Sequence, residues 1–488
     1  MACRPWARYL IGTDAWARMA AGLPAEPTLS LIALWADAGH AHAILLDEVS
    51  LAVLPVSVAV EAGFYPALSP SRPAAAWLER MIFDLWGHTA FGGTDPRPWL
   101  DHGRWPNLHP MASPPRAMGP PAEPPEFLPA EGEDLNQVPV GPIHAGVIEP
   151  GHFRFSASGE TVMRLEVRLG YAHKGTLGLM RGKSVRVAAR FAARLSGDTT
   201  VAHAAAFSIA VEAALAVEIP ARAKRLRAAM LEIERVANHL GDAGAICNDT
   251  SFAFLHARFG YHREAMLRAS AVAFGHRLMM DTVVPGGLAD DVFSPGLNEV
   301  LVALAAVEAE LPELIRNIEN HSSLADRLVS SGIVSAELAR RFAAGGFVGR
   351  ASGRGFDARR LSVPDGDVFH VRVAMLAGGD VDARLRIRLA EIVESTRLIR
   401  LNFSDLPEGA ICATLPEGNG EGIGCVEGFR GDTWAWLRIG SGNIEEVFLR
   451  DPSWFQWPLL EAAVRGNILA DFPLINKSFN CSYSGVDL

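Results

Sequence analysis

The first part of the chain combines two patterns of apolar positions. Short apolar runs at residues 29–35 and 41–46, and a valine-rich run at 51–60, are separated by turn residues and predict β-strands. Residues 74–85 place apolar side chains at helical spacing and predict a helix. Together they predict a small, mixed N-terminal domain in a chain of the α+β class.

Helical periodicity dominates later in the chain. After two alternating segments at 153–155 and 162–169, which predict strands, an apolar stripe runs from Leu226 to Leu240 and predicts a helix that ends at Gly241. Two more helices are predicted at residues 297–318 and 383–401, and Pro312 is expected to kink or divide the first of them. Strands return at 424–448, so the pattern predicts a mainly helical domain with peripheral β-strands.

A proline-rich stretch separates these two parts. Eight prolines lie between Pro110 and Pro129, and proline fits neither a helix interior nor a central strand. We therefore expect an N-terminal domain at residues 1–110, an extended linker at 111–135 and a larger domain at 136–488.

Composition narrows the class of partner and compartment. The 488 residues carry a net charge of −10, which argues against nucleic acid as a partner. The five cysteines are far apart in sequence, which fits a reducing cytoplasm and excludes a local zinc or iron-sulfur cage. No uncharged apolar run approaches the roughly 18 residues of a membrane span, and the first residues lack an apolar signal core. We expect neither a transmembrane segment nor a signal peptide.

Two short motifs bear on metal chemistry. Residues 194–203 read R-L-S-G-D-T-T-V-A-H, which resembles the R-x-C-G-x-C-x-x-x-H motif of nickel-iron hydrogenase large subunits. Residues 480–484 read N-C-S-Y-S, which resembles the terminal D-P-C-x-x-C motif of that family. Three of the four metal-binding cysteines are thus replaced, by Ser196, Thr199 and Ser484, and only Cys481 remains. Neutral hydroxyls do not hold a soft metal as thiolates do, so the resemblance implies a member that binds no metal.

The resemblance extends over about 350 residues in collinear order. Residues 140–155, V-G-P-I-H-A-G-V-I-E-P-G-H-F-R-F, resemble the start of the large subunit of energy-converting nickel-iron hydrogenases of the formate hydrogenlyase type. The Y-A-H-K-G turn at 171–175 is similar to a turn of both that family and the quinone-site large subunit of complex I. Residues 79–87, E-R-M-I-F-D-L-W-G, resemble a signature of the small hydrophilic complex I subunit. The resemblance implies that a domain like this small hydrophilic subunit is fused to the N-terminus of the part that resembles a large subunit.

Four histidines are candidates for quinone binding or proton handling. His144 lies in the G-P-x-H loop, where complex I places a histidine at the quinone head group, and His152 follows in the same, longer loop. His173 lies in the turn at 171–175, and His203 ends the motif at 194–203. Histidine titrates near neutral pH and can donate to a quinone oxygen. The alternatives are that the first two bond backbone in a turn and that His173 and His203 are ordinary core residues.

The resemblance implies a subunit on the cytoplasmic face of the inner membrane, in a hetero-oligomeric hydrogenase-like or complex I-like complex. Its expected partners are a small subunit that carries an iron-sulfur cluster and antiporter-like membrane subunits. The chain itself is expected to bind no cofactor, although quinone remains possible. The expected function is electron transfer to quinone or another acceptor, coupled to ion translocation; the alternative is a non-catalytic coupling subunit that keeps the fold for assembly.

The glycine-rich stretch 418–424 lacks the G-x-G-x-x-G register, so dinucleotide binding is not expected there.

Overall fold

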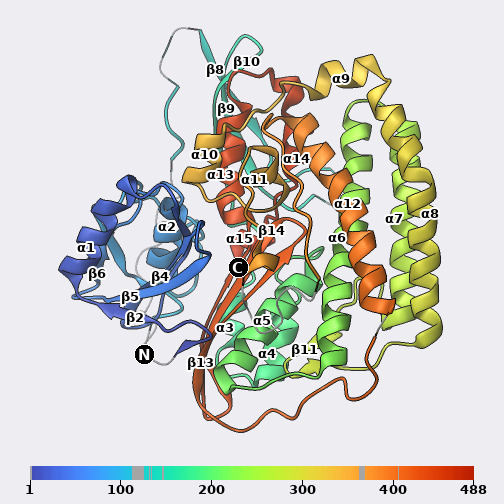
Figure 1. Ribbon diagram of the computed structural model, residues 1–488. Helices are drawn as coiled ribbons and strands as arrows, with labels where there is room; N and C mark the ends of the chain where they lie inside the picture. The colour runs from blue at the N-terminus through green and yellow to red at the C-terminus, as the bar shows by residue number, and fades with distance from the viewer. Residues whose placement is uncertain are drawn as a thin grey trace.

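The computed structural model describes residues 3–112, 126–130, 132, 134–145, 148–361, 369–404 and 406–488. A small N-terminal unit lies beside a larger one, in which long helices stand on the side away from the N-terminal unit (Figure 1). A sheet of the larger unit lies between these helices and the N-terminal unit. Helices and strands are mixed throughout, which agrees with the predicted α+β class.

The N-terminal unit is built on a four-stranded sheet in the order β2-β5-β4-β3. Its strands are β2 (Tyr9–Ile11), β3 (Leu29–Ala36), β4 (His40–Asp47) and β5 (Ala52–Ala59). Helix α2 (Ala75–Trp86) packs on β3, as the apolar spacing predicts, and α1 (Thr13–Gly22) and the parallel pair β6 (Phe64–Pro66) and β7 (Thr89–Phe91) complete the unit. The three strands and the helix predicted from the sequence therefore agree with the structure to within one or two residues.

The charged residues of the 79–87 signature bind backbone inside this unit. The Glu79 carboxylate accepts hydrogen bonds from the N–H groups of Leu68 and Ser69. The Asp84 carboxylate accepts three, from residues 99–101. Arg80 donates to the carbonyl groups of Arg97 and Pro98. Since buried backbone N–H groups need acceptors, these side chains fix the loops around α2.

The two units contact each other closely. Strand β1 (Cys3–Arg4) pairs in parallel with β13 (Gly420–Gly428) of the larger unit. Arg8 binds the Glu421 carboxylate, and Arg438 binds Asp37. Most of the predicted linker, namely 113–125, 131 and 133, lies outside the described residues.

The sheet of the larger unit packs unusually closely on α5 (Thr200–Leu215). It contains β13, β14 (Gly431–Gly440) and β15 (Asn443–Arg450). A Cβ atom on Gly420, Gly422 or Gly424 would lie 2.0–2.1 Å from a carbonyl oxygen of α5, at Ala214, Ala210 and Ala206 respectively. Glycine at every second strand position thus meets alanine at every fourth helix position, and the two backbones touch. Strands β13 and β14 are almost wholly buried, so the prediction of peripheral strands was wrong for these two, whereas β15 has exposed positions near its start.

Four long helices form the other side of the larger unit: α6 (Ala221–Asp249), α7 (Ala253–Phe274), α8 (Ser294–Glu319) and α12 (Val381–Ser404). The predicted end of one of them was wrong, and the predicted division of another did not occur. Helix α6 does not end at Gly241, because the missing side chain there makes room for Arg263 of α7. Pro312 lies inside α8, which continues past it as one helix, so the proline does not divide it.

Shorter elements surround this framework. The sheet β10-β9-β8 lies at one end of the molecule, with β8 (Leu135–Val140), β9 (His152–Ser158) and β10 (Thr161–Arg168). The remaining elements are α3 (Thr176–Met180), α4 (Val185–Ala192), β11 (Val283–Val284), β12 (Gly287–Leu288), α9 (Ser322–Leu328), α10 (Ala336–Arg341), α11 (Gly346–Ala351), α13 (Ser453–Val464), α14 (Phe472–Phe479) and α15 (Ser484–Asp487). Within the described parts of the chain, no helix is both long enough and apolar enough to span a bilayer.

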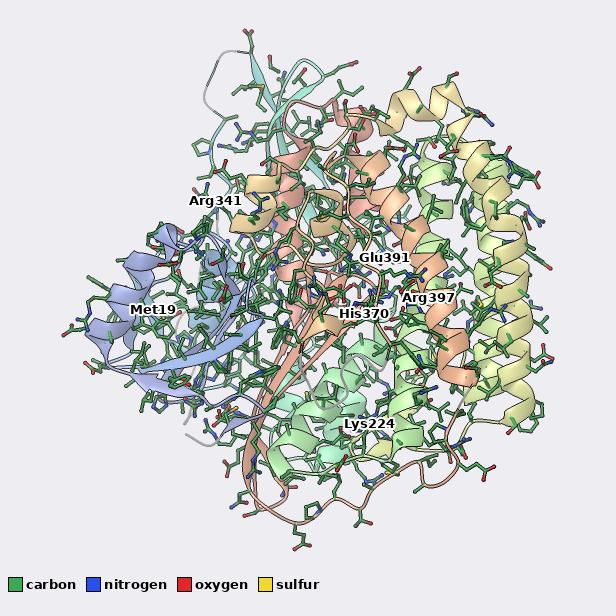
Figure 2. The ribbon with its side chains drawn as sticks, in the orientation of Figure 1. Met19, Lys224, Arg341, His370, Glu391 and Arg397 are labelled. Carbon is green, nitrogen blue, oxygen red and sulfur yellow. The ribbon has the colours of Figure 1, made fainter. Side chains whose placement is uncertain are left out.

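A network of charges is buried where α6, α11 and α12 meet. Glu391 of α12, labelled in Figure 2, accepts hydrogen bonds from Arg350 at 2.8 Å and from His239 at 2.7 Å. Arg350 also binds Glu427 at 2.8 Å and Asp357 at 3.2 Å. The arginines offset the burial of Glu391 and hold its pKa far below the usual value. Each charge has a partner, so the network holds helices and sheet together.

Candidate functional site

The two motifs that resemble metal-binding segments lie side by side. Ser196, before α5, and Ser482, before α15, have their hydroxyl oxygens 2.8 Å apart. Ser196 also donates to the Asp198 carboxylate at 3.1 Å. The fold thus brings together residues 194–200 and 480–485, which are almost 300 positions apart in sequence. We refer to this place as the cleft.

An ion pair stands beside these serines. The Arg430 guanidinium, from the turn between β13 and β14, binds the Asp198 carboxylate through two hydrogen bonds of 2.6 Å each. The same guanidinium donates to the Asn480 carbonyl oxygen. Two parallel charge-assisted bonds fix both partners in direction as well as distance. The pair therefore joins the 194–200 loop, the sheet and the C-terminal segment in one arrangement.

The four positions that resemble metal ligands carry one thiol and three hydroxyls. The hydroxyl oxygens of Thr199 and Ser484 are buried and have no hydrogen-bond partner. The Cys481 sulfur is buried 4.0 Å from the side-chain oxygen of Gln456, and burial raises the pKa of this thiol well above its usual value. Within the residues that the structure describes, no group of three or more His, Cys, Asp and Glu side chains could hold a metal ion. This donor set does not fit a nickel-iron pair, which needs thiolates.

His203 lies deeper, on α5. Its Nε2 atom is 3.0 Å from the Asp451 carboxylate, which also accepts a hydrogen bond from the Ser453 N–H at 2.8 Å. The Nδ1 atom of His203 is buried without a partner. Its environment is that of a core histidine held by one carboxylate.

His144 and His152 lie at the two ends of one turn. The Nε2 atom of His144 is 2.7 Å from the Gly151 carbonyl oxygen, and the Nδ1 atom of His152 is 3.3 Å from that of Gly141. Gly141 has a φ of +81°, and a Cβ atom there would lie 2.3 Å from the Gly151 oxygen, so the turn requires glycine. Burial, together with Arg154, lowers the pKa of His152 and keeps it neutral. Each histidine thus bonds backbone, as one of the sequence alternatives expects.

The turn that carries His173 is attached to the C-terminal segment. The Nδ1 atom of His173 is 2.5 Å from the Asp487 carbonyl oxygen, and its ring stacks on Trp105. The Asp487 carboxylate accepts hydrogen bonds from Gly170 and Ala172, and burial raises its pKa to about 7. Lys174 donates to the carbonyl oxygens of residues 194 and 195, at 2.8 Å each. This turn therefore joins both motifs of the cleft.

The 141–152 turn reaches the same place through one contact. Glu149 accepts a hydrogen bond from the Ser484 N–H at 3.0 Å. The segments that carry His144, His152 and His173 are thus all connected to the C-terminal motif, whereas His203 is held separately by Asp451. The structure brings the predicted segments together without bringing the four rings into mutual contact.

Several residues around the cleft were missed by the sequence analysis. Arg430 and Asp451 lie 232 and 248 positions from their partners Asp198 and His203, and no local pattern pairs them. Glu234 was not singled out as a site residue either. Its carboxylate accepts hydrogen bonds from Val201 and Ala202 at the start of α5, at 2.7 and 3.2 Å, and burial raises its pKa to about 8. Partners that are distant in sequence cannot be paired from spacing alone.

The chain is similar in sequence to several known proteins. Residues 250–418 match the family described as the respiratory-chain NADH dehydrogenase 49 Kd subunit. Formate hydrogenlyase subunit 5 of Escherichia coli K12 is 30% identical over 439 residues, which cover 87% of this chain and 77% of that protein. The membrane-bound hydrogenase subunit alpha of Pyrococcus furiosus is 29% identical over 374 residues, covering 72% of this chain and 87% of the relative. An NADH-quinone oxidoreductase subunit from Dehalococcoides mccartyi is 28% identical over 360 residues, covering 71% of this chain and 97% of the relative.

Among solved structures, a chain of an archaeal respiratory membrane complex, the membrane-bound sulfane sulfur reductase, has the same fold. The TM-score is 0.67 at 22% identity, and the match covers 73% of this chain and 99% of the other. These relatives are subunits of membrane-bound hydrogenase and complex I-type assemblies. This chain accordingly belongs to the family of large subunits that complex I and the membrane-bound hydrogenases share.

Proposed function

We propose that this chain is the large subunit of a membrane-bound complex of the hydrogenase or complex I type and that it holds no nickel-iron centre. We further propose that it takes part in electron transfer to quinone or another acceptor, coupled to ion translocation. The observation that carries the proposal is the Asp198–Arg430 ion pair, with Ser196 and Ser482 beside it. An ordered polar network stands where relatives of the hydrogenase type would need four thiolates.

The proposal requires partner subunits. The chain contributes no iron-sulfur ligands in its described parts, so electrons reach it from a small subunit that carries a cluster. Ile143 and Ile148, on the 141–152 turn, are 88% and 48% exposed, and apolar side chains so exposed on one turn favour contact with another chain. Antiporter-like membrane subunits would complete the complex. The N-terminal unit is, in this proposal, the counterpart of the small hydrophilic complex I subunit, fused to the large one.

His144 is the proposed contact to the acceptor, and its hydrogen bond restricts what it can do. Because Nε2 donates to the Gly151 carbonyl oxygen, the neutral ring has only Nδ1 left, as an acceptor. Neutral His144 can therefore accept a hydrogen bond from a hydroquinone hydroxyl. A ring protonated at both nitrogens would instead donate to a quinone oxygen through Nδ1.

The second candidate is a non-catalytic coupling subunit. The observation in its favour is that all four candidate histidines have a ring nitrogen bonded inside the protein: His144, His152 and His173 to backbone, and His203 to a carboxylate. In that case the loops around the cleft persist because they hold the interfaces.

One experiment separates the two candidates. The complex, purified with its cluster subunit, is titrated with a short-chain quinone in its reduced, hydroquinone form, from which the neutral His144 ring can accept a hydrogen bond, and its nickel and iron are measured. Catalytic function predicts saturable binding that His144→Gln weakens about tenfold, roughly the effect of one hydrogen bond. His256→Gln is the matched control, since His256 also bonds a backbone carbonyl, at 3.1 Å, but lies on α7. Absence of quinone binding to the unmodified complex favours the coupling role, and stoichiometric nickel in this chain would overturn both.

A further inference from the structure

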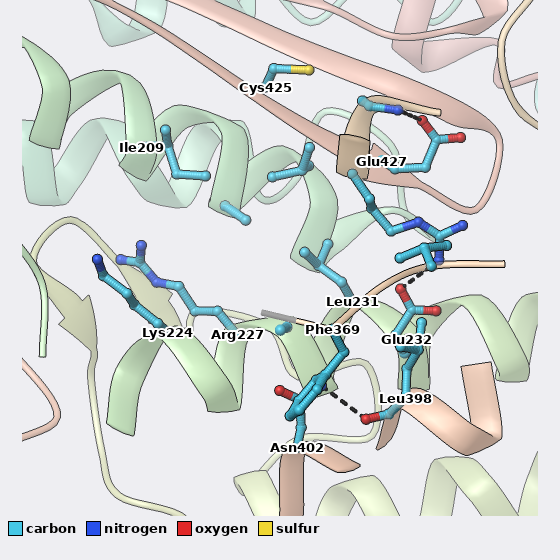
Figure 3. A pocket seen from close by; sticks show the side chains of 16 residues that line it. Ile209, Lys224, Arg227, Leu231, Glu232, Phe369, Leu398, Asn402, Cys425 and Glu427 are labelled. Carbon is cyan, nitrogen blue, oxygen red and sulfur yellow. Dashed lines mark hydrogen bonds and ion pairs between the residues drawn. The ribbon is translucent and has the colours of Figure 1, made fainter. Parts of the chain in front are cut away.

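A pocket lies apart from the residues of the cleft. This pocket of about 90 Å³ opens between α5, α6, α12 and β13 (Figure 3). Its walls are mainly apolar and include Ile209, Leu231, Leu398 and Val426. The cleft residues described above do not line it. Its volume is of the same order as the ~150 Å³ apolar cavity that admits a benzene ring.

The charged groups at one end of the pocket already have partners. Glu427 accepts hydrogen bonds from Arg350 at 2.8 Å and from the Ala358 N–H at 2.9 Å. Glu232 accepts from Arg359 at 2.9 Å and from Ser395 at 2.6 Å. Because these carboxylates are neutralised inside the protein, a ligand needs no charge of its own to enter.

One polar group at the pocket has no partner. Asn402 of α12 is 3% exposed, and its side-chain nitrogen donates to the Leu398 carbonyl oxygen at 2.9 Å. Its side-chain oxygen is buried and accepts no hydrogen bond. Asn402 and Phe369 both line the pocket (Figure 3). A buried acceptor without a donor is unfavourable, and leucine here would fill the same space without that cost.

We infer that this pocket binds a small uncharged molecule with an apolar body, of the size of a single aromatic ring, whose one hydroxyl or N–H group donates to the side-chain oxygen of Asn402. The apolar walls select the body of the ligand and the lone acceptor selects its donor. Water satisfies this pocket poorly, because a bound water needs two to four polar partners and the neighbouring carboxylates are already occupied.

Two probes of nearly equal shape test the inference on the full-length chain. Binding of 4-fluorophenol and of fluorobenzene is measured by fluorine NMR of the ligand. We expect the unmodified protein to bind 4-fluorophenol about tenfold more tightly, as one hydrogen bond to a buried acceptor implies. Asn402→Leu should remove this preference while fluorobenzene still binds. Asn298→Leu, at an exposed position of α8, should leave the preference unchanged.

A further variant keeps the test decisive if Asn402→Leu does not fold. Ala228 lines the pocket but is only partly buried, so Ala228→Leu fills the space without touching the acceptor. It should abolish binding of both probes. Equal affinity for the two probes in the unmodified protein, or binding that survives Ala228→Leu, would overturn the inference.

Discussion

Replacing Gly422 by alanine should destabilise the larger unit strongly. The added Cβ atom would lie 2.0 Å from the Ala210 carbonyl oxygen, and ordinary van der Waals contact begins at 3.4 Å, so β13 and α5 must separate by about 1.4 Å. Overpacking a dense interior usually costs about 1–3 kcal/mol. Here the obstacle is helix backbone and cannot rotate away, so we expect a loss of about 3 kcal/mol in the free energy of unfolding.

The matched control is the same substitution where there is space. Gly260 lies inside α7 with nothing within 4 Å of a Cβ atom, and Gly260→Ala should stabilise the protein by about 0.5–1 kcal/mol through helix propensity. Urea unfolding followed by tryptophan fluorescence, to which the buried Trp434 and Trp436 of the neighbouring strand β14 contribute, measures both variants. If Gly422→Ala unfolds at the same urea concentration as the unmodified chain, close packing on α5 is not the reason for glycine there.

Three other predictions concern the cleft and the unit boundary. Restoring thiols with Ser196→Cys, Thr199→Cys and Ser484→Cys should give neither bound nickel nor hydrogen evolution, because Arg430 still holds Asp198 between the restored positions. Nickel analysis and gas chromatography test this, and hydrogen evolution by the triple variant would contradict it. Burial raises the pKa of Glu234 to about 8 in the folded protein, so ionising this carboxyl group opposes folding. The free energy of unfolding should therefore fall as the pH rises from about 4.5 to 8, by at most about 1.4 kcal/mol per pH unit. Glu234→Gln should flatten this slope in urea titrations, and an unchanged slope would refute the assignment. Limited proteolysis should cut first within 110–129 and leave two fragments. These fragments should elute together from a sizing column, since ion pairs and the β1–β13 pairing join the two units. Fragments that separate would show that these contacts are weak.

Local patterns predicted much of the fold. The strands of the N-terminal unit and helix α2 agree closely with the sequence analysis, because their apolar spacing reports directly on one buried face. Gly241 shows where this reasoning fails. A glycine after an apolar stripe is a good sign of a helix end, but here it serves contact with Arg263 of another helix, and the helix continues. Tertiary packing decided the boundary, and single-sequence patterns do not contain it.

The cleft was predictable only in outline. The motifs identified Ser196 and Cys481 as positions of interest, but the partners of Ser196 and Asp198 are Ser482 and Arg430, 286 and 232 residues away. Likewise, the register of the glycines in 418–424 does not match a nucleotide-binding motif, but their close approach to the carbonyl groups of α5 could not be deduced from the sequence. Such pairings need the fold, because no periodicity links one segment to the other.

The pairing of Arg8 with Glu421 also has a consequence for biosynthesis. The two residues are 413 positions apart, and ribosomes add about 5–20 residues per second, so Arg8 waits roughly 20 to 80 s for its partner. During that time β1 has no strand beside it, and Asp37 also lacks Arg438. The N-terminal unit is therefore made first and completed last. A translation pause before β13 would prolong a partly assembled state, so the order of synthesis, and not only the native contacts, determines when this unit becomes stable.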